Sequence, residues 1–306
     1  MSSPIRCEGV AKRFRRVAAV DGLELEVPEG SIYALIGPNG AGKTTLIKML
    51  VNILRPSEGH CVVLDTDARR LTAREFEQIG YVSENQNIPK ALTVGEYLDY
   101  LRPFYLNWDR SLEASLLREL RLPGERSIGD LSHGMRMKAA LAFALPFHPK
   151  LLILDEPLSG LDSLVRDEFM AGLLRQLDET TVLISSHELS EIEGIATHVG
   201  FIEEGKLLFE ESMSELTARF REVHVTLDRE AVRPGSAPQG WLNLRALGNV
   251  VSFVDCRFSE DQLGAGIESL NGGVRNVDAR PMSLRAIFTA LALSARDATE
   301  SKGARQ

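Results

Sequence analysis

One stretch of eight residues determines which fold this chain can adopt: Gly37-Pro38-Asn39-Gly40-Ala41-Gly42-Lys43-Thr44. It satisfies the pattern GxxxxGK(S/T), whose glycines allow backbone N–H groups to turn inward around a polyphosphate. The residues before it, Ser31–Ile36, have the composition of a buried strand, and Thr45–Leu50 after it favour a helix. A helix that begins at such a loop adds its partial positive charge to the same site. The stretch therefore predicts a loop that binds nucleotide phosphates.

Two side chains at the end of this loop carry chemistry of their own. We expect the Lys43 ammonium group to reach the β- and γ-phosphates and the Thr44 hydroxyl to ligate Mg²⁺. Thr45, the next residue, completes the predicted nucleotide-binding set. The alternative is a glycine-rich turn that binds nothing, and the strand before the loop and the helix after it argue against that alternative.

A second candidate site lies far along the chain, where an apolar run ends in two carboxylates. Residues 151–154 are all Leu or Ile, and Asp155 and Glu156 follow them. A continuous apolar run is typical of a parallel strand covered on both faces. Open parallel sheets bind ligands at the carboxyl ends of their strands, so we expect both carboxylates beside the phosphate-binding loop. There Asp155 would hold Mg²⁺ through water and Glu156 would polarise the attacking water. Taken alone, the segment is also compatible with a strand followed by a solvated acidic turn.

The composition is that of an ordinary globular protein. Of 306 residues, 44% are hydrophobic and 25% are charged, and the formal net charge is −8. This acidic balance argues against a protein that coats nucleic acid, so no nucleic-acid partner is expected. The three cysteines, Cys7, Cys61 and Cys256, lack metal-ligand spacing and suggest a reducing compartment. The longest apolar stretch, 139–147, is too short to span a bilayer, and the N-terminus lacks the apolar segment of a secretory signal. We therefore expect a cytoplasmic protein.

The order of predicted elements indicates an α/β protein with a mostly parallel sheet. Short strands occur within residues 5–35, and helical spacing of apolar residues predicts an inserted helical subdomain at about 85–148. Strands and helices then alternate. The predicted elements are strands at 151–154 and 182–185, helices at 164–178 and 189–195, and a closing hairpin at 199–209.

The composition changes after about Ser214. Strand-like segments at 222–227 and 250–254 and an amphipathic stretch at 284–292 predict a small α+β C-terminal extension over 215–295. The polar and charged tail, 296–306, is expected to be disordered.

The turn Leu131-Ser132-His133-Gly134-Met135 resembles the LSGGQ signature of ABC-type ATPases. Other motifs of that family occur in the family's order. They are Phe14 at the aromatic position that stacks on adenine, Glu84 or Gln86 in the Q-loop region, the D-loop Ser159-Gly160-Leu161-Asp162, and the switch histidine His187. The resemblance covers about residues 5–213, and the order of its motifs is highly specific.

The resemblance implies both a fold and a set of roles. The fold would be a P-loop NTPase domain of the ABC nucleotide-binding type over 1–214, with a mostly parallel sheet, an antiparallel β subdomain and an inserted helical subdomain. ATP and Mg²⁺ would be its ligands, with Glu156 as general base and Lys43 and His187 completing the catalytic set. The Ser132–Met135 turn would contact the γ-phosphate held by a partner subunit, so that ATP joins a head-to-tail dimer.

Three positions in two motifs depart from the family pattern. His133 replaces the first glycine of the signature and Met135 replaces its glutamine, whereas Gly134 is retained. In the Q-loop region, alignment on Gly80-Tyr81-Val82 places Glu84 where the family has glutamine, with Gln86 two residues further on. Either side chain remains a candidate for the Q-loop role.

The leading hypothesis is the ATP-hydrolysing subunit of an ABC transporter, of the export type, bound to the inner face of the cell membrane. Its partners would be separate integral membrane permease subunits and a second nucleotide-binding subunit, identical or different. Residues 280–288 are similar to the end of the C-terminal extension in many bacterial export-type ATPases. The alternatives are a soluble ABC-type ATPase linked to ribosomes or nucleic acid, and a regulatory ATPase that transmits mechanical work without moving a substrate.

Overall fold

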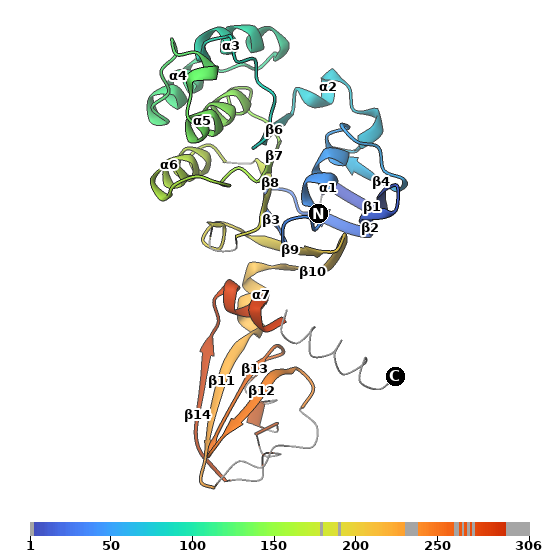
Figure 1. Cartoon of the computed structure of the whole chain (residues 1–306), viewed down its shortest axis with the longest axis vertical. Helices are drawn as coiled ribbons and strands as arrows, with labels where there is room; N and C mark the ends of the chain where they lie inside the picture. The colour runs from blue at the N-terminus through green and yellow to red at the C-terminus, as the bar shows by residue number, and fades with distance from the viewer. Residues whose placement is uncertain are drawn as a thin grey trace. The chain divides into compact units, whose positions relative to one another are not determined.

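The computed structural model describes residues 3–177, 180–188, 191–229, 238–259, 263–264, 266–267, 270 and 273–291 (Figure 1). The chain divides into two compact units, Met1–Glu210 and Glu211–Gln306. Every candidate site residue lies in the first unit. The division falls close to the boundary expected after 214, and the assignment of each unit as a domain with its own role stays a prediction.

A six-stranded sheet with strand order β10-β9-β3-β8-β7-β6 forms the centre of the first unit. Its strands are β3 (Ile32–Ile36), β6 (Ile79–Ser83), β7 (Leu151–Asp155), β8 (Thr181–Ser186), β9 (His198–Glu203) and β10 (Lys206–Ser212). β3 pairs in parallel with β8 and β9, and β7 pairs in parallel with β6 and β8. Every residue of β7 and β8 is buried, as expected for apolar parallel strands covered on both faces. The predicted α/β fold with a mostly parallel sheet is confirmed.

The register of the parallel strands brings their carboxyl ends to one edge of the sheet. Ile36 at the end of β3 lies opposite Ser186 of β8, and Asp155 at the end of β7 lies opposite Ser185. The chain leaves β3 at this edge and enters the phosphate-binding loop, which leads into α1 (Lys43–Leu50). Open parallel sheets bind their ligands at the carboxyl ends of the strands, so a ligand site is expected at this edge.

An antiparallel sheet, of strand order β2-β1-β4-β5, covers α1 on its other side. Its strands are β1 (Ile5–Phe14), β2 (Val17–Val27), β4 (Glu58–Val63) and β5 (Thr66–Asp67). Leu46 and Leu50 of α1 belong to one core cluster with Val10 of β1 and Ile153 of β7. Each fully buried leucine contributes about 2 kcal/mol from removal of apolar surface from water. That burial fixes the start of α1, and with it the phosphate-binding loop.

Short helices follow β5, and the helical subdomain is inserted between β6 and β7. The elements are η1 (Ala68–Arg70), α2 (Ala73–Phe76), α3 (Val94–Leu101), η2 (Arg102–Phe104), α4 (Arg110–Glu119), η3 (Ile128–Asp130) and α5 (His133–Ala144). Figure 1 shows α3, α4 and α5 gathered together. The helix starts follow capping chemistry: Thr93 and Glu96 form a capping box on α3, and Asp109 caps α4. Within the described residues, no helix has the length and apolar character needed to cross a bilayer.

The second unit has its own sheet and its own core. It contains α7 (Met213–Arg219), β11 (Arg221–Leu227), β12 (Trp241–Leu247), β13 (Val250–Asp255), β14 (Val274–Pro281) and a helix over 284–291. The strand order is β12-β13-β11-β14, and the pairs are antiparallel. Val223, Val225, Trp241 and Phe253 are among the residues of its separate core cluster. The tail predicted to be disordered, 296–306, lies outside the described residues.

Two helix predictions need correction. α6 spans Ser163–Leu174 and so ends before the predicted 178. Of the helix predicted over 189–195, residues 189–190 lie outside the described residues, Glu191 has 3₁₀ conformation, and 192–195 form turns. Two features oppose a regular helix there: Gly194 disfavours it, and the Glu191 side chain is held by contacts outside the segment.

Candidate active site

The phosphate-binding loop lies so close to neighbouring strands that two of its positions have no room for a Cβ atom and require glycine. Gly42 has φ of 113°, in the left-handed region, and a Cβ atom there would lie 2.3 Å from the carbonyl oxygen of Ala19. A Cβ atom on Gly37 would lie 2.0 Å from the carbonyl oxygen of Ile202. A larger residue at either position would push the loop away from β2 or β9.

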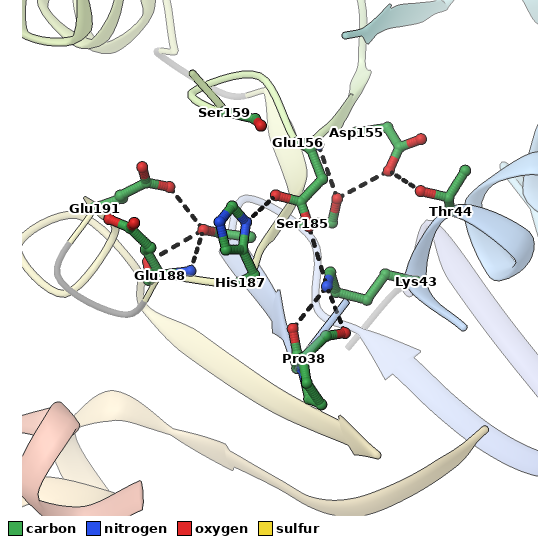
Figure 2. A network of polar contacts seen from close by, with 12 residues as sticks. Pro38, Lys43, Thr44, Asp155, Glu156, Ser159, Ser185, His187, Glu188 and Glu191 are labelled. Carbon is green, nitrogen blue, oxygen red and sulfur yellow. Dashed lines mark hydrogen bonds and ion pairs between the residues drawn. The ribbon is translucent and has the colours of Figure 1, made fainter. Parts of the chain in front are cut away.

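The Lys43 side chain is buried and folds back over the loop (Figure 2). Its Nζ donates to the carbonyl oxygens of Gly37 at 2.6 Å and Pro38 at 3.1 Å. The same Nζ lies 3.0 Å from Oε1 of Glu156. These oxygen atoms fix a positive charge at the loop, which is the charge that a polyphosphate requires.

Asp155, at the end of β7, forms a buried hydroxyl–carboxylate cluster. Its Oδ1 accepts hydrogen bonds from the hydroxyls of Thr44 and Ser185, each at 3.0 Å. Burial raises the pKa of the Asp155 carboxyl, and the two hydroxyl bonds oppose part of that rise. The structure thus brings together the metal-binding pair proposed from the sequence, and its oxygen donors are of the type that Mg²⁺ prefers.

Glu156 lies between a cation and an imidazole ring. Its Oε1 faces Lys43, and its Oε2 lies 2.8 Å from Nδ1 of His187, which must donate because a carboxylate oxygen accepts (Figure 2). The Glu156 backbone N–H donates to the Ser185 hydroxyl at 2.9 Å, and its φ is 51°. A non-glycine residue in this left-handed region is held there by its surroundings, so the carboxylate is aimed by a specific turn.

A cavity of about 260 Å³ opens on this cluster, lined by residues 39–45 of the loop with Ala19, Glu84 and Glu156. Gln86 lines a different cavity, of about 160 Å³, together with His133 and Arg136. Glu84 contributes to the walls of both cavities. Glu84 is therefore the Q-loop candidate that borders the phosphate-binding loop, and Gln86 is the one that borders α5.

The signature turn begins α5. Ser132 is the N-cap and accepts a hydrogen bond from the Met135 N–H at 3.2 Å. Gly134 packs tightly on α6, because a Cβ atom there would lie 2.7 Å from Cγ1 of Val165. Among the described residues that line the 260 Å³ cavity, none comes from 131–135. The structure therefore does not bring the signature turn to the phosphate-binding loop of the same subunit.

The remaining predicted residues, Asp162 and Phe14, do not line the 260 Å³ cavity. Asp162 caps α6 and accepts from the Val165 N–H at 3.0 Å. Phe14, at the end of β1, is 45% exposed, and the Lys12 ammonium lies 5.3 Å from the centre of its ring. The Phe14 ring is thus accessible for stacking and is not part of the buried core.

Sequence reasoning missed three side chains that support the site. Ser185 bridges Asp155 and the Glu156 backbone. Glu191 accepts from the Ser186 hydroxyl at 2.7 Å and lies 3.0 Å from the guanidinium of Arg166 on α6. Ser185 had a usable signal, since it ends a parallel strand at the same edge as Asp155. Arg166 and Glu191 had none, because their contact joins segments far apart in the chain.

Comparison with known proteins identifies the class that this fold and loop define. Residues 20–159 match the family described as ABC transporter. Over 225 residues the chain is 35% identical to the bacitracin transport ATP-binding protein BcrA of Enterococcus faecalis, covering 72% of this chain and 73% of BcrA. It is 32% identical to the lantibiotic transport ATP-binding protein SrtF of Streptococcus pyogenes, covering 67% of this chain and 90% of SrtF. This chain belongs to the family of ABC transporter ATP-binding proteins, and it is an ATPase that binds ATP.

Solved structures of the same fold agree. An ATP-binding subunit of an ABC transporter superposes with a TM-score of 0.64 at 23% identity, covering 71% of this chain and 92% of that chain. The ATP-binding cassette MJ0796, in a dimeric post-hydrolysis state with ADP and phosphate, superposes with a TM-score of 0.61 at 23% identity and covers 68% of this chain and 98% of that chain.

Proposed function

We propose that this chain is the ATP-hydrolysing subunit of an ABC exporter, which drives a separate membrane permease by ATP-dependent closure of a dimer. The observation that carries the proposal is the position of Glu156, whose carboxylate lies between Lys43 and His187 beside the phosphate-binding loop. BcrA and SrtF are named as bacitracin and lantibiotic transport ATP-binding proteins, which supports a transport role for this chain.

Glu156 is the general base of the proposed mechanism. Its carboxylate takes a proton from the attacking water, and the His187 ring holds that carboxylate in place and contacts the γ-phosphate. Lys43 places its positive charge where negative charge develops on the transferred phosphoryl group. The tight turn at Glu156 keeps the carboxylate aimed without a rearrangement at the moment of reaction.

Mg²⁺ fits the hydroxyl and carboxylate oxygens that Thr44 and Asp155 place side by side. When bound there, Mg²⁺ supplies positive charge to the β- and γ-phosphate oxygens. Thr44 would ligate the ion directly, and Asp155 would hold it through water. Glu84, which lines the same cavity, is the Q-loop residue best placed to sense it.

The proposed active unit is a head-to-tail dimer of nucleotide-binding subunits, identical or different. Ser132 and the backbone N–H groups of the Ser132–Met135 turn would bind the γ-phosphate held by the partner subunit. The close packing of Gly134 against Val165 supports this role, because it holds the start of α5 on α6 and gives the turn a fixed backbone. Phe14 would stack on the adenine, a contact worth about 1–3 kcal/mol in comparable base–aromatic pairs.

The proposed permease contact lies on the helical subdomain, at the inner face of the membrane. Tyr100, Phe104 and Leu106 are exposed there, and Leu106 is 89% exposed. Exposed aromatic and aliphatic side chains in one segment are typical of a protein–protein interface. The fit of this segment with a cytoplasmic loop of the permease would transmit dimer closure to the membrane.

The test is the substitution Glu156→Gln, which keeps the shape of the side chain and removes its ability to accept a proton. We expect this variant to bind ATP, to lose hydrolysis by about 100-fold or more, and to accumulate as an ATP-bound dimer. Glu125→Gln, the same change at an exposed position, is the matched control. Hydrolysis at the wild-type rate by Glu156→Gln would refute the general-base role.

Reconstitution separates transport from the alternatives. Vesicles that contain the permease and this chain are expected to accumulate substrate only with hydrolysable ATP. ATP turnover without substrate movement would support a regulatory ATPase instead, and co-sedimentation with ribosomes or DNA would support a nucleic-acid-linked one.

A further inference from the structure

His133 adds a side chain to the start of α5 where the family pattern has a glycine. Its Nε2 lies 3.0 Å from the backbone carbonyl oxygen of Ser159. A carbonyl oxygen only accepts, so Nε2 must carry the proton and donate it. The bond therefore joins the signature turn to the D-loop turn of the same subunit.

Ser159 belongs to the short turn that carries the proposed general base. The Ser159 N–H donates to the Glu156 carbonyl oxygen at 3.2 Å, and Asp162 ends the same turn as the N-cap of α6. Figure 2 shows Ser159 on this turn, next to Glu156. Only two hydrogen bonds thus separate the His133 ring from the backbone of Glu156, whose left-handed φ depends on support from its surroundings.

The ring of His133 lies beside the D-loop turn. A Cβ atom on Gly160 would lie 3.8 Å from two atoms of the ring, an ordinary van der Waals distance. His133 also lines the 160 Å³ cavity together with Glu84 and Gln86. The close contact between Gly134 and Val165 holds the start of α5 against α6 and keeps the ring within reach of Ser159.

We propose that His133 is a positioning residue of this ATPase, whose Nε2–H bond to the Ser159 carbonyl holds the turn bearing Glu156 and Asp162 against the start of α5. The inference rests on the proposed role of Glu156 as general base. His133 does not line the phosphate-loop cavity and acts through the turn. A glycine at position 133 cannot make this hydrogen bond, so this way of holding the turn requires a side-chain donor at position 133.

Loss of the bond should slow the chemical step and leave nucleotide binding intact. The turn would visit more conformations, and the Glu156 carboxylate would spend less time aimed at the attacking water. The phosphate-binding loop makes none of these contacts, so the affinity of a single subunit for ATP should not change. A neutral hydrogen bond of ordinary strength corresponds to a change of about fivefold in rate.

Three substitutions of one residue separate the donor from the bulk of the ring. His133→Gln carries an amide donor at about the reach of Nε2. His133→Asn carries the same amide group too close to the backbone to reach Ser159, and His133→Phe keeps a ring without a donor. In the full-length chain, we expect His133→Phe and His133→Asn to lower kcat about fivefold, with the ATP dissociation constant within about twofold of wild type, and His133→Gln to restore most of the lost rate. Equal kcat in the Phe variant and wild type, or equal loss in the Gln and Phe variants, would overturn the proposal.

Amide hydrogen exchange gives a second readout that does not depend on turnover. We expect the amide of Ser159 to exchange faster in the Phe and Asn variants than in wild type and His133→Gln, while strand β7 keeps its protection. Unchanged exchange at Ser159 in the Phe variant would contradict the proposal. A wild-type chain without ATPase activity would contradict the proposed function, whereas an active wild type with an equally active Phe variant contradicts only the role of His133.

Discussion

Asp155 is a buried carboxylate that the fold holds at some expense of stability. It lies at the end of a fully buried strand, and its surroundings raise its pKa although two hydroxyl groups donate to it. A carboxyl whose pKa is raised on folding stabilises the native state fully only below its unfolded pKa, and that contribution is lost as the pH rises through the folded pKa. At neutral pH the protein therefore keeps a charge that disfavours folding, which is reasonable where the charge is needed to hold Mg²⁺.

Asp155→Asn should accordingly stabilise the protein and inactivate it. The amide accepts the same hydroxyl bonds without a buried charge, so we expect the free energy of unfolding near pH 7.5 to rise by about 1 kcal/mol. The difference from wild type should shrink as the pH is lowered toward the ordinary carboxyl pKa of about 4. Urea unfolding at several pH values measures the difference in the free energy of unfolding. The same substitution should also lower Mg²⁺-dependent ATP hydrolysis. A variant that is less stable than wild type at neutral pH and more stable in acid would show that the charge on Asp155 stabilises the folded protein, which contradicts this prediction.

At the level of helices and strands, the sequence predicts those features that depend on the pattern of neighbouring residues. The apolar run before Asp155 predicted a parallel strand, and the rule for carboxyl ends predicted that Asp155 and Glu156 would lie beside the phosphate-binding loop. In the structure they contact Thr44 and Lys43 of that loop. The side-chain partners of His133 and Glu191 could not be predicted, because they depend on how α5, α6 and the segment after β8 pack together. No local pattern carries that information.

The contact between α6 and the segment after β8 is an ion pair of this unpredictable kind. The Glu191 side chain is 2% exposed and the Arg166 side chain 28% exposed, and their charged groups lie 3.0 Å apart, yet burial still raises the pKa of Glu191. The Ser186 hydrogen bond and the attraction to Arg166 therefore do not fully offset the loss of hydration of the carboxylate. The Arg166 Nε is itself buried without a hydrogen-bond partner among the described residues. The pair therefore connects α6 to the segment after β8 without adding much stability. Glu191 also accepts a hydrogen bond from Ser186, which precedes His187 in the chain.

Breaking this connection on one side should be more harmful than removing both sides. Glu191→Ala leaves the half-buried Arg166 guanidinium without its carboxylate partner, so we expect the free energy of unfolding to fall by about 1–2 kcal/mol. The double variant Arg166→Met/Glu191→Ala should lose less than the sum of the two single changes, with a coupling energy of about 1 kcal/mol or more. Denaturant unfolding of the four proteins completes the cycle. Strict additivity would mean that the two side chains do not interact in solution.

At the scale of the whole molecule, the candidate residues of the nucleotide site all lie in one of the two units. The phosphate-binding loop, the carboxylates and both cavities beside them belong to Met1–Glu210. The second unit closes its sheet over a separate core, with Trp241 stacked on Phe253 at a centroid distance of 3.6 Å. Two cores that share no residue are the condition for two units that can fold separately.

A chain that ends after Ser212, where β10 ends, should therefore keep the nucleotide site. It retains every strand of the central sheet and both sides of the core around α1, so we expect it to fold and to bind ATP within about threefold of the full-length affinity, a difference of about 0.6 kcal/mol. Titration with ATP measures the affinity, circular dichroism establishes the fold, and full-length protein is the control. A folded fragment that binds ATP more than about tenfold more weakly would contradict this prediction, because a loss of that size, about 1.4 kcal/mol, would mean that the second unit contributes to the affinity for ATP.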